Sequence, residues 1–138
     1  MANEVQLMAT ALFSETKDLD DAVGIANVMM NRLKNPQRFG KTLEEVVYAP
    51  SQFSGVGTPE WEKAATKKFK NSKEEGIYKQ FLSVSSRALK GQLEDTTGGA
   101  DHYVNLKLAN PSWAKAYKST AKIGQHTYFS EALTKNRR

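Results

Sequence analysis

The sequence predicts a mainly α fold of the α+β class, in which a helical domain carries a small antiparallel β-sheet or hairpin near its C-terminus. Two patterns support this prediction. As far as Gly91, apolar residues recur at the spacing of amphipathic helices. After Gly91 that period is lost, and short extended runs alternate with glycine-containing turns. At 138 residues the chain has the size of one domain, so a single domain over 1–138 is expected.

Five helices are expected before Gly91, most of them behind a polar capping residue. Their starts are expected near Glu4, Asp21, Thr42, Thr58 and Ser72. The second, from Asp21 to Leu33, is apolar on so many sides that it should be the central, buried helix. Asn35-Pro36 is expected to stop it, and residues 37–40 then form a connection.

The C-terminal part is expected to hold two or three strands. Residues 100–105 form one short extended run. Residues 121–129 form two strands joined by a tight hairpin turn at Gly124-Gln125. Residues 111–114 are expected to be an irregular loop that carries an aromatic side chain.

The composition favours an anionic partner. The chain carries 20 Lys and Arg residues against 15 Asp and Glu residues, a formal net charge of +5. Such a balance suits nucleic acid, an acidic membrane surface or the anionic cell envelope. Much of the excess lies in residues 63–73 and in the tail Lys135–Arg138, and runs of this kind are most often solvated surface. The absence of cysteine excludes disulfides and thiol catalysis.

Glu15 is the candidate catalytic acid. On a helical wheel Met8, Leu12 and Phe13 share one apolar stripe, and Glu15 falls at its border. A half-buried carboxyl group at such a border is suited to donate a proton to a bound substrate. A glutamate near a helix end is nonetheless most often a solvated surface residue, so this spacing alone is a weak signal.

Other reaction classes have less support. His102 and His126 lie far apart without metal-ligand spacing, so we expect no metal site, and no motif indicates a cofactor. No nucleic-acid-reading motif accompanies the lysine-rich stretch, so no specific nucleic-acid partner is expected. A polysaccharide groove suits the acid better, because sugar rings pack their C–H faces on aromatic side chains. The aromatic residues of the loops and strands are Phe53, Tyr103, Trp113, Tyr128 and Phe129.

Five blocks of sequence stand in order along nearly the whole chain. They are Leu12–Thr16, Ala22–Arg32, Ser51–Ser54, Asp95–Ala100 and Ile123–Phe129. Together they resemble the SleB-like cell-wall hydrolases, a family that includes spore-cortex-lytic enzymes and many phage lysins. The resemblance implies a lysozyme-like, mostly helical fold and cleavage of the β-1,4 bond between N-acetylmuramic acid and N-acetylglucosamine in peptidoglycan.

The same resemblance implies roles for individual residues. The family's catalytic glutamate lies where Glu15 lies. Further residues are expected to bind the glycan or to support the groove, and two aromatic residues join them as candidates. The full substrate-binding set is Gln52, Phe53, Ser54, Thr97, Gly98, Gly99, His102, Tyr103, Trp113, His126 and Tyr128.

The second step of the reaction depends on a second carboxylate. The family commonly carries another glutamate just downstream of the acid, and after Glu15 this chain reads Thr16-Lys17-Asp18, so that glutamate is missing or displaced. Asp101 is the candidate second carboxylate, with Asp18 and Asp20 as alternatives. A hydrolytic muramidase would use such a partner, whereas a lytic transglycosylase can use Glu15 alone, as acid and then as base. Transglycosylation is favoured, and a non-catalytic basic wall-binding or nucleic-acid-binding module is the further alternative.

The expected setting is bacterial lysis. The first residues lack the basic start and apolar core of a secretory signal, and no run is long enough to cross a bilayer. The chain therefore looks like a phage endolysin, made in the host cytoplasm and admitted to the periplasmic wall after membrane permeabilisation, or like a lysin carried in the virion. A monomer is expected.

Overall fold

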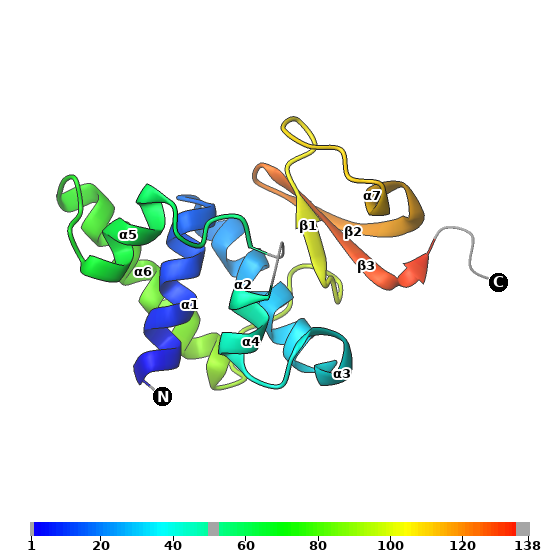
Figure 1. The fold of residues 1–138 in the computed structure, drawn as a ribbon, viewed down its shortest axis with the longest axis horizontal. Helices are drawn as coiled ribbons and strands as arrows, with labels where there is room; N and C mark the ends of the chain where they lie inside the picture. Colours follow the sequence, from blue (N-terminus) through cyan, green and yellow to red (C-terminus); the bar gives the residue numbers. More distant parts are fainter. Residues whose placement is uncertain (1, 50–52, 135–138) are drawn as a thin grey trace.

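The structure is a computed structural model, and it describes residues 2–49 and 53–134. A helical part is followed by a three-stranded sheet (Figure 1), which confirms the predicted fold class. The helices are α1 (Ala2–Glu15), α2 (Leu19–Leu33), α3 (Pro36–Phe39), α4 (Leu43–Tyr48), α5 (Pro59–Thr66), α6 (Ser72–Leu89) and α7 (Trp113–Ala116). The strands are β1 (His102–Val104), β2 (Tyr117–Ile123) and β3 (His126–Thr134).

The helices α1 and α2 form the centre of the helical part. α1 packs against α6, α5, α2 and α4, and its apolar stripe is fully buried, including Met8, Leu12 and Phe13. α2 begins behind Asp18, whose carboxylate accepts a hydrogen bond from the Asp21 N–H at 3.0 Å. Most of α2 is buried, as its apolar pattern predicts. The packing of α1 and its connection to the buried helix α2 therefore fix the position of Glu15 at the end of α1.

Three local expectations were wrong. Residues 36–39 form the short helix α3, because Pro36 fits the first turn of a helix, where its missing N–H is not needed. Residues 113–116 form α7 instead of an irregular loop. The cap of α6 is Asn71, whose side chain accepts from the Glu74 N–H at 2.9 Å, and not the expected Ser72.

The sheet has the strand order β1-β3-β2, and both pairs are antiparallel. The predicted turn at Gly124-Gln125 joins β2 to β3, and Gly124 has a φ of 58° that suits glycine. In the register of β1 and β3, Tyr103 lies opposite Tyr128 and His102 lies opposite Phe129. Since side chains alternate along a strand, the two tyrosines share one face of the sheet and His102 and Phe129 share the other.

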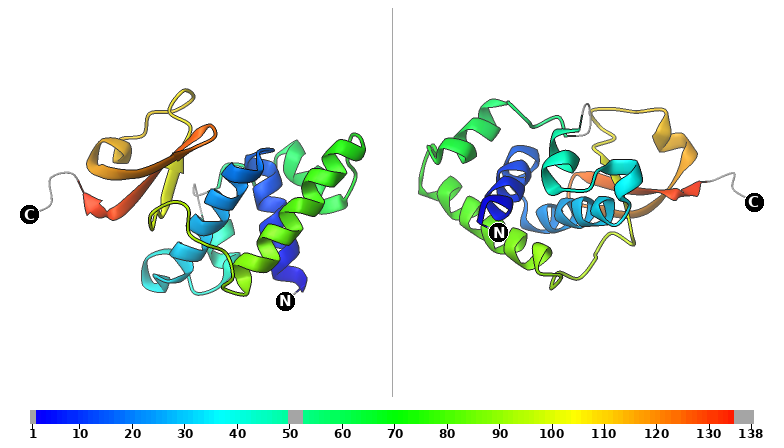
Figure 2. Two further views of the ribbon diagram at one scale, coloured as in Figure 1. Left: turned by 180° about the vertical axis from the view of Figure 1, so that it is seen from behind. Right: turned by 60° about the horizontal axis from the view of Figure 1, so that its bottom comes forward.

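The tyrosine face of the sheet packs on α2. Tyr128 is fully buried, and its hydroxyl lies so close to Gly24 that a Cβ there would come within 2.5 Å of it. Two further views show the sheet beside the helical part, with the hairpin turn near the start of α2 (Figure 2). In the described part of the chain, no helix has the length and apolar character needed to span a membrane.

Candidate active site

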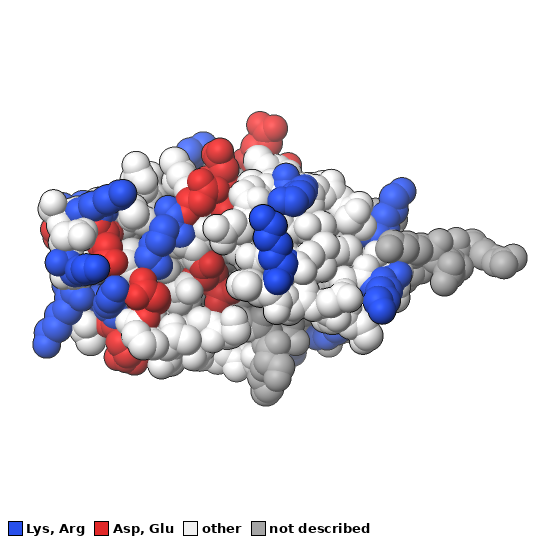
Figure 3. All heavy atoms as spheres, turned by 90° about the horizontal axis from the view of Figure 1, so that it is seen from above, with Lys and Arg blue, Asp and Glu red and all other residues white. Residues whose placement is uncertain are grey.

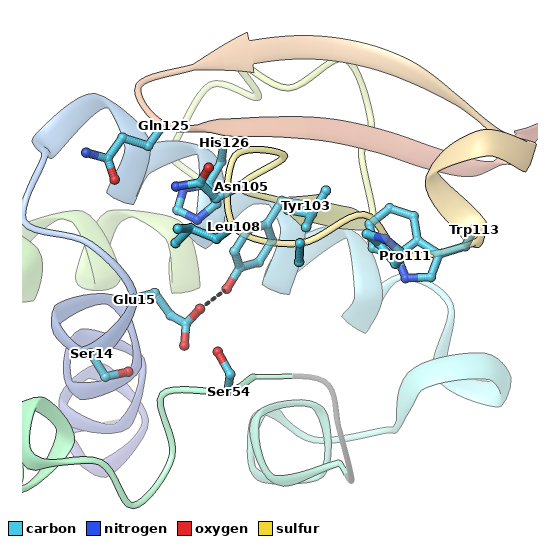
Figure 4. Close-up of a pocket in the computed structure, with 12 residues that line it drawn as sticks. Ser14, Glu15, Ser54, Tyr103, Asn105, Leu108, Pro111, Trp113, Gln125 and His126 are labelled. Carbon is cyan, nitrogen blue, oxygen red and sulfur yellow. Dashed lines mark hydrogen bonds between the residues drawn. The ribbon is translucent and has the colours of Figure 1, made fainter.

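A groove of about 500 Å³ lies between the end of α1 and the sheet. Its residues come from four regions: the end of α1, the loop before α5, the segment from β1 to α7, and the β2–β3 turn (Figure 4). They are Ser14, Glu15, Ser54, Tyr103, Val104, Asn105, Leu108, Ala109, Pro111, Trp113, Gln125 and His126. Residues far apart in the sequence therefore meet around one carboxylate.

Glu15 is half-buried at the end of α1, as the helical wheel predicts, and both its oxygens are engaged. Oε1 accepts a hydrogen bond from the Tyr103 hydroxyl at 2.7 Å. Oε2 accepts one from the Gly55 N–H at 2.7 Å. A Cβ on residue 55 would collide with the Ser14 hydroxyl and come within 2.5 Å of Oε2, so only glycine brings its N–H this close.

Tyr103 connects the sheet to the acid. Burial raises the pKa of its hydroxyl well above the ordinary value, and the Glu15 carboxylate adds to this rise. The hydroxyl therefore stays protonated and remains a hydrogen-bond donor to Glu15. The Phe53 ring packs against Tyr103 with centroids 6.2 Å apart, and the Tyr128 ring lies 5.9 Å away.

A second polar cluster stands behind Tyr103. The carboxylate of Asp21, which is 1% exposed, lies 2.5 Å from Nδ1 of His126 and accepts a hydrogen bond from the Tyr128 hydroxyl at 2.6 Å. The His126 ring meets the Tyr103 ring edge to face, with centroids 5.0 Å apart. Burial, followed by the bond to Asp21, raises the pKa of the Tyr128 hydroxyl, so it too remains a donor.

Glu15 is the only carboxylate on the groove among the residues that the structure describes. Asp18 is engaged as the cap of α2. The candidate second carboxylate, Asp101, accepts hydrogen bonds from the Glu131 N–H at 2.9 Å and pairs with Nδ1 of His102 at 2.9 Å. Burial raises the pKa of Asp101, but these partners outweigh burial and hold the pKa below its ordinary value.

The structure places the predicted substrate-binding residues in two groups. Ser54, Tyr103, Trp113 and His126 line the groove. The other predicted residues that the structure describes do not line the groove, and a supporting role, the second of the two expected, stays the prediction for them. These others are Phe53, Thr97, Gly98, Gly99, His102 and Tyr128. Gln52 lies outside the described residues.

Burial and local bonding fit the supporting role. Tyr128 and Thr97 are fully buried, and Phe53 and His102 are nearly so, so their side chains can only support the groove. The Thr97 hydroxyl donates to Asp95 at 2.6 Å and accepts from the Ala100 N–H at 3.1 Å. Residues 95–100 thus form a tight turn that leads the chain into β1 and towards Tyr103.

Sequence reasoning missed several residues of the site. Asp21 was expected only as the start of a helix, and its pairing with His126 joins residues 105 positions apart. Gly55 supplies a backbone N–H, which a side-chain search does not consider. The one feature of the sequence that points to Gly55 is its position directly after the block Ser51–Ser54. Asn105, Leu108 and Gln125 line the groove and belong to loops without a recognisable motif.

The lysine-rich stretch does not form a purely basic surface. Lys63 lies 2.8 Å from Glu60 and 3.3 Å from Glu74, and Lys17 also pairs with Glu60 at 2.9 Å. Figure 3 shows acidic and basic side chains intermingled at the end formed by α5 and the start of α6. No group of three or more metal-ligating side chains occurs within residues 2–49 and 53–134.

A mostly helical fold that presents a lone half-buried carboxylate on a groove lined by Tyr103 and Trp113 suits an enzyme active site. Comparison with known proteins agrees. The cell wall hydrolase family matches residues 17–129, and the chain belongs to this family. The match begins just after Glu15. Comparison with curated protein sequences gives no match.

Two solved structures share the fold. The catalytic domain of the Bacillus cereus SleB protein is 25% identical, with a TM-score of 0.66 over 94% of this chain and 91% of that one. The catalytic domain of the germination-specific lytic transglycosylase SleB from Bacillus anthracis is 26% identical, with a TM-score of 0.63 over 93% of this chain and 94% of that one. The predicted SleB-like family is thus confirmed, and peptidoglycan cleavage in general is supported.

Proposed function

We propose that the protein is a peptidoglycan lytic transglycosylase that cleaves the β-1,4 bond between N-acetylmuramic acid and N-acetylglucosamine, with Glu15 as general acid and base. The observation that carries the proposal is the environment of Glu15. It is the single carboxylate on the groove among described residues, and Tyr103 and Gly55 hold its two oxygens. The similar Bacillus anthracis SleB domain is itself a lytic transglycosylase.

In the first step Glu15 gives its proton to the glycosidic oxygen, and the bond to the muramic C1 breaks through an oxocarbenium-like state. Each carboxyl oxygen has a second lone pair besides the one used by Tyr103 or Gly55, so one oxygen can carry this proton. The carboxylate that remains keeps both hydrogen bonds. These preformed donors stabilise the negative charge without any rearrangement.

In the second step the muramic C6 hydroxyl attacks C1, and its proton passes to Glu15. The products are a 1,6-anhydromuramic end and a free 4-hydroxyl on the leaving sugar, and no water is consumed. Glu15 regains its proton and is ready for another cycle. This route suits a site with one carboxylate, whereas hydrolysis normally uses a second one to bind a water or the sugar.

Mass spectrometry of products from purified peptidoglycan tests the proposal. We expect 1,6-anhydromuramic ends, and reducing muramic ends alone would contradict transglycosylation in favour of a muramidase. Glu15→Gln should abolish cleavage while the melting temperature stays nearly unchanged. Glu62→Gln, which removes the same charge from an exposed position on α5, is the matched control and should remain active. If the Glu15→Gln variant still cleaves peptidoglycan, Glu15 is not the general acid.

The biological setting follows as part of the same proposal. A cell-wall-cleaving enzyme with this groove suits phage-induced lysis, either as an endolysin or as a lysin of the virion. Detection of the protein in purified virions by immunoblotting would distinguish the second setting from the first.

A further inference from the structure

His126 is the one groove residue whose orientation is fixed by a buried carboxylate. It is the first residue of β3, directly after the hairpin turn, and its side chain is 12% exposed. Asp21, at 1% exposed, holds Nδ1 at 2.5 Å. The hairpin turn rests on the same helix start, since a Cβ on Gly124 would lie 3.0 Å from the Asp18 carboxylate. The bond to Asp21 and the edge contact with Tyr103 therefore hold the ring.

The hydrogen-bond network assigns the tautomer of His126. A carboxylate can only accept, and the Tyr128 hydroxyl already donates to the other oxygen of Asp21. Nδ1 of His126 must therefore carry the hydrogen in its bond to Asp21. In the neutral ring this leaves Nε2 as an acceptor, and Nε2 has no hydrogen-bond partner in residues 2–49 and 53–134.

Because Nδ1 is directed at the buried Asp21, the opposite edge of the ring, which carries Nε2, is the part of His126 that can face the groove. Glu15 and His126 both contact Tyr103, because the hydroxyl of Tyr103 binds Glu15 and its ring meets the edge of His126. Figure 4 shows Glu15 near the hydroxyl end of Tyr103 and His126 farther along the same residue. A sugar bound over Tyr103 thus meets a proton donor at one end and a fixed acceptor at the other.

We propose that His126 is a substrate-orienting residue that accepts a hydrogen bond from the attacking C6 hydroxyl of the muramic sugar, with Asp21 and Tyr128 as positioning residues. This inference rests on the proposed transglycosylation and names what that reaction needs beyond its acid. The attacking hydroxyl hangs on a freely rotating bond, and water in the open groove competes with it for C1. A fixed acceptor selects the rotamer in which the hydroxyl oxygen faces C1.

The role leaves the proton balance unchanged. The hydroxyl donates to Nε2 while the sugar binds. As the oxygen attacks C1, the O–H bond turns from Nε2 towards the Glu15 carboxylate, which takes the proton, and His126 ends the cycle in the form in which it began. Loss of Nε2 should therefore slow formation of the anhydro ring and admit water as the competing nucleophile, which produces a reducing end.

Two substitutions test the roles of Nδ1 and Nε2 of His126 one at a time. His126→Asn places an amide near the position of Nδ1, so it keeps a donor for Asp21 and lacks any atom at Nε2. His126→Gln reaches as far as Nε2 and offers an amide oxygen there. His102→Asn is the matched control, because His102 also pairs with an aspartate through Nδ1 but does not line the groove.

The readout is the share of reducing ends among all new muramic ends, measured by mass spectrometry. Only folded, active molecules produce ends, so this share does not depend on how much of a variant folds. For His126→Asn we expect anhydro ends to form about 2- to 10-fold more slowly, the effect of one neutral hydrogen bond, and the share of reducing ends to rise. His126→Gln should reverse part of the rise, and His102→Asn should show none.

An unchanged share of reducing ends in His126→Asn would overturn the inference, and so would an equal rise in His102→Asn. The proposed function fails separately. If the unaltered enzyme releases only reducing ends, or if Glu15→Gln still cleaves, transglycosylation by Glu15 is wrong. Anhydro ends from the unaltered enzyme, an inert Glu15→Gln and an unchanged His126→Asn would together refute the role of His126 alone.

Discussion

The sheet presents the same chemical pair, a histidine and an aspartate, on each of its two faces. On the groove face His126 pairs with Asp21 of α2, and the second nitrogen of the ring is left to the groove. On the outer face His102 pairs with Asp101, its neighbour in sequence, and lies among Trp113 and Tyr117 with ring centroids 4.9 and 5.1 Å away. The pair alone therefore does not define a function, since the surroundings of the second nitrogen decide it.

The difference also concerns stability. Asp21 is buried at 1% exposure and joins β3 to α2 through two side chains, His126 and Tyr128. The side chain of Asp101 is 15% exposed, and its partners lie within the sheet region itself. The inner pair therefore holds two layers of the protein together, whereas the outer pair stabilises one layer.

The largest effect that would test this contrast is on folding. Asp21→Ala should lower the free energy of unfolding by about 3–5 kcal/mol, the cost of breaking a buried pair and leaving its partners unsatisfied. Asp101→Ala should cost about 1 kcal/mol, since water reaches its site more easily. Urea unfolding of both variants measures the difference. Equal losses would show that the inner pair does not join the layers.

Loss of the Tyr103 hydroxyl, which binds Glu15 on the groove face, should have a smaller effect, and this effect should be on the turnover rate. Tyr103→Phe keeps the ring that packs against His126 and removes the hydrogen bond to the carboxylate. A hydrogen bond to a charged group contributes about 1.5–3 kcal/mol, so kcat should fall about 10- to 100-fold. Tyr117→Phe, which removes a hydroxyl of the outer face, should leave kcat near that of the unaltered enzyme. Steady-state turnover of peptidoglycan by the two variants checks this.

The smallest effect is the pH dependence of the outer pair. The folded protein holds the pKa of Asp101 below its ordinary value of 3.8, so the folded state releases that proton more readily than the unfolded state. This contribution to stability is present above about pH 4 and is lost as the pH falls below it. Asp101→Asn should therefore flatten the decline in melting temperature at acid pH. A decline as steep as in the unaltered protein would assign it to other carboxylates, such as Asp95.

The sequence predicts the helices of the core well, because their apolar faces repeat over several turns. It misses α3 and α7, which are too short to show a period, and it selects Ser72 over Asn71 because both residues can cap a helix. Strand β1 and the hairpin are predicted in place, since Gly124 marks the turn and the flanking residues favour strands.

The candidate site was predictable in part. Glu15 was found because a helical wheel placed it at an apolar border and the ordered blocks gave it a role. The pairing of Asp21 with His126 was out of reach, since it depends on how the sheet docks on α2. Residue type gave no means to separate Tyr103, which lines the groove, from Tyr128, which is fully buried. That distinction follows from the close approach of Tyr128 to Gly24 of α2.

The loop from β1 to α7 differs from every other wall of the groove. Asn105 organises it locally, accepting from the Lys107, Leu108 and Ala109 N–H groups, and Leu108 is 84% exposed. The acid, Tyr103 and His126 are held instead by α1, α2 and the sheet, and the second donor, Gly55, lies in the loop before α5. Variation in this loop therefore carries little risk to folding or to the chemistry. Exchange of this loop would therefore reshape one wall of the groove while Glu15, Tyr103 and His126 keep their support from the rest of the fold.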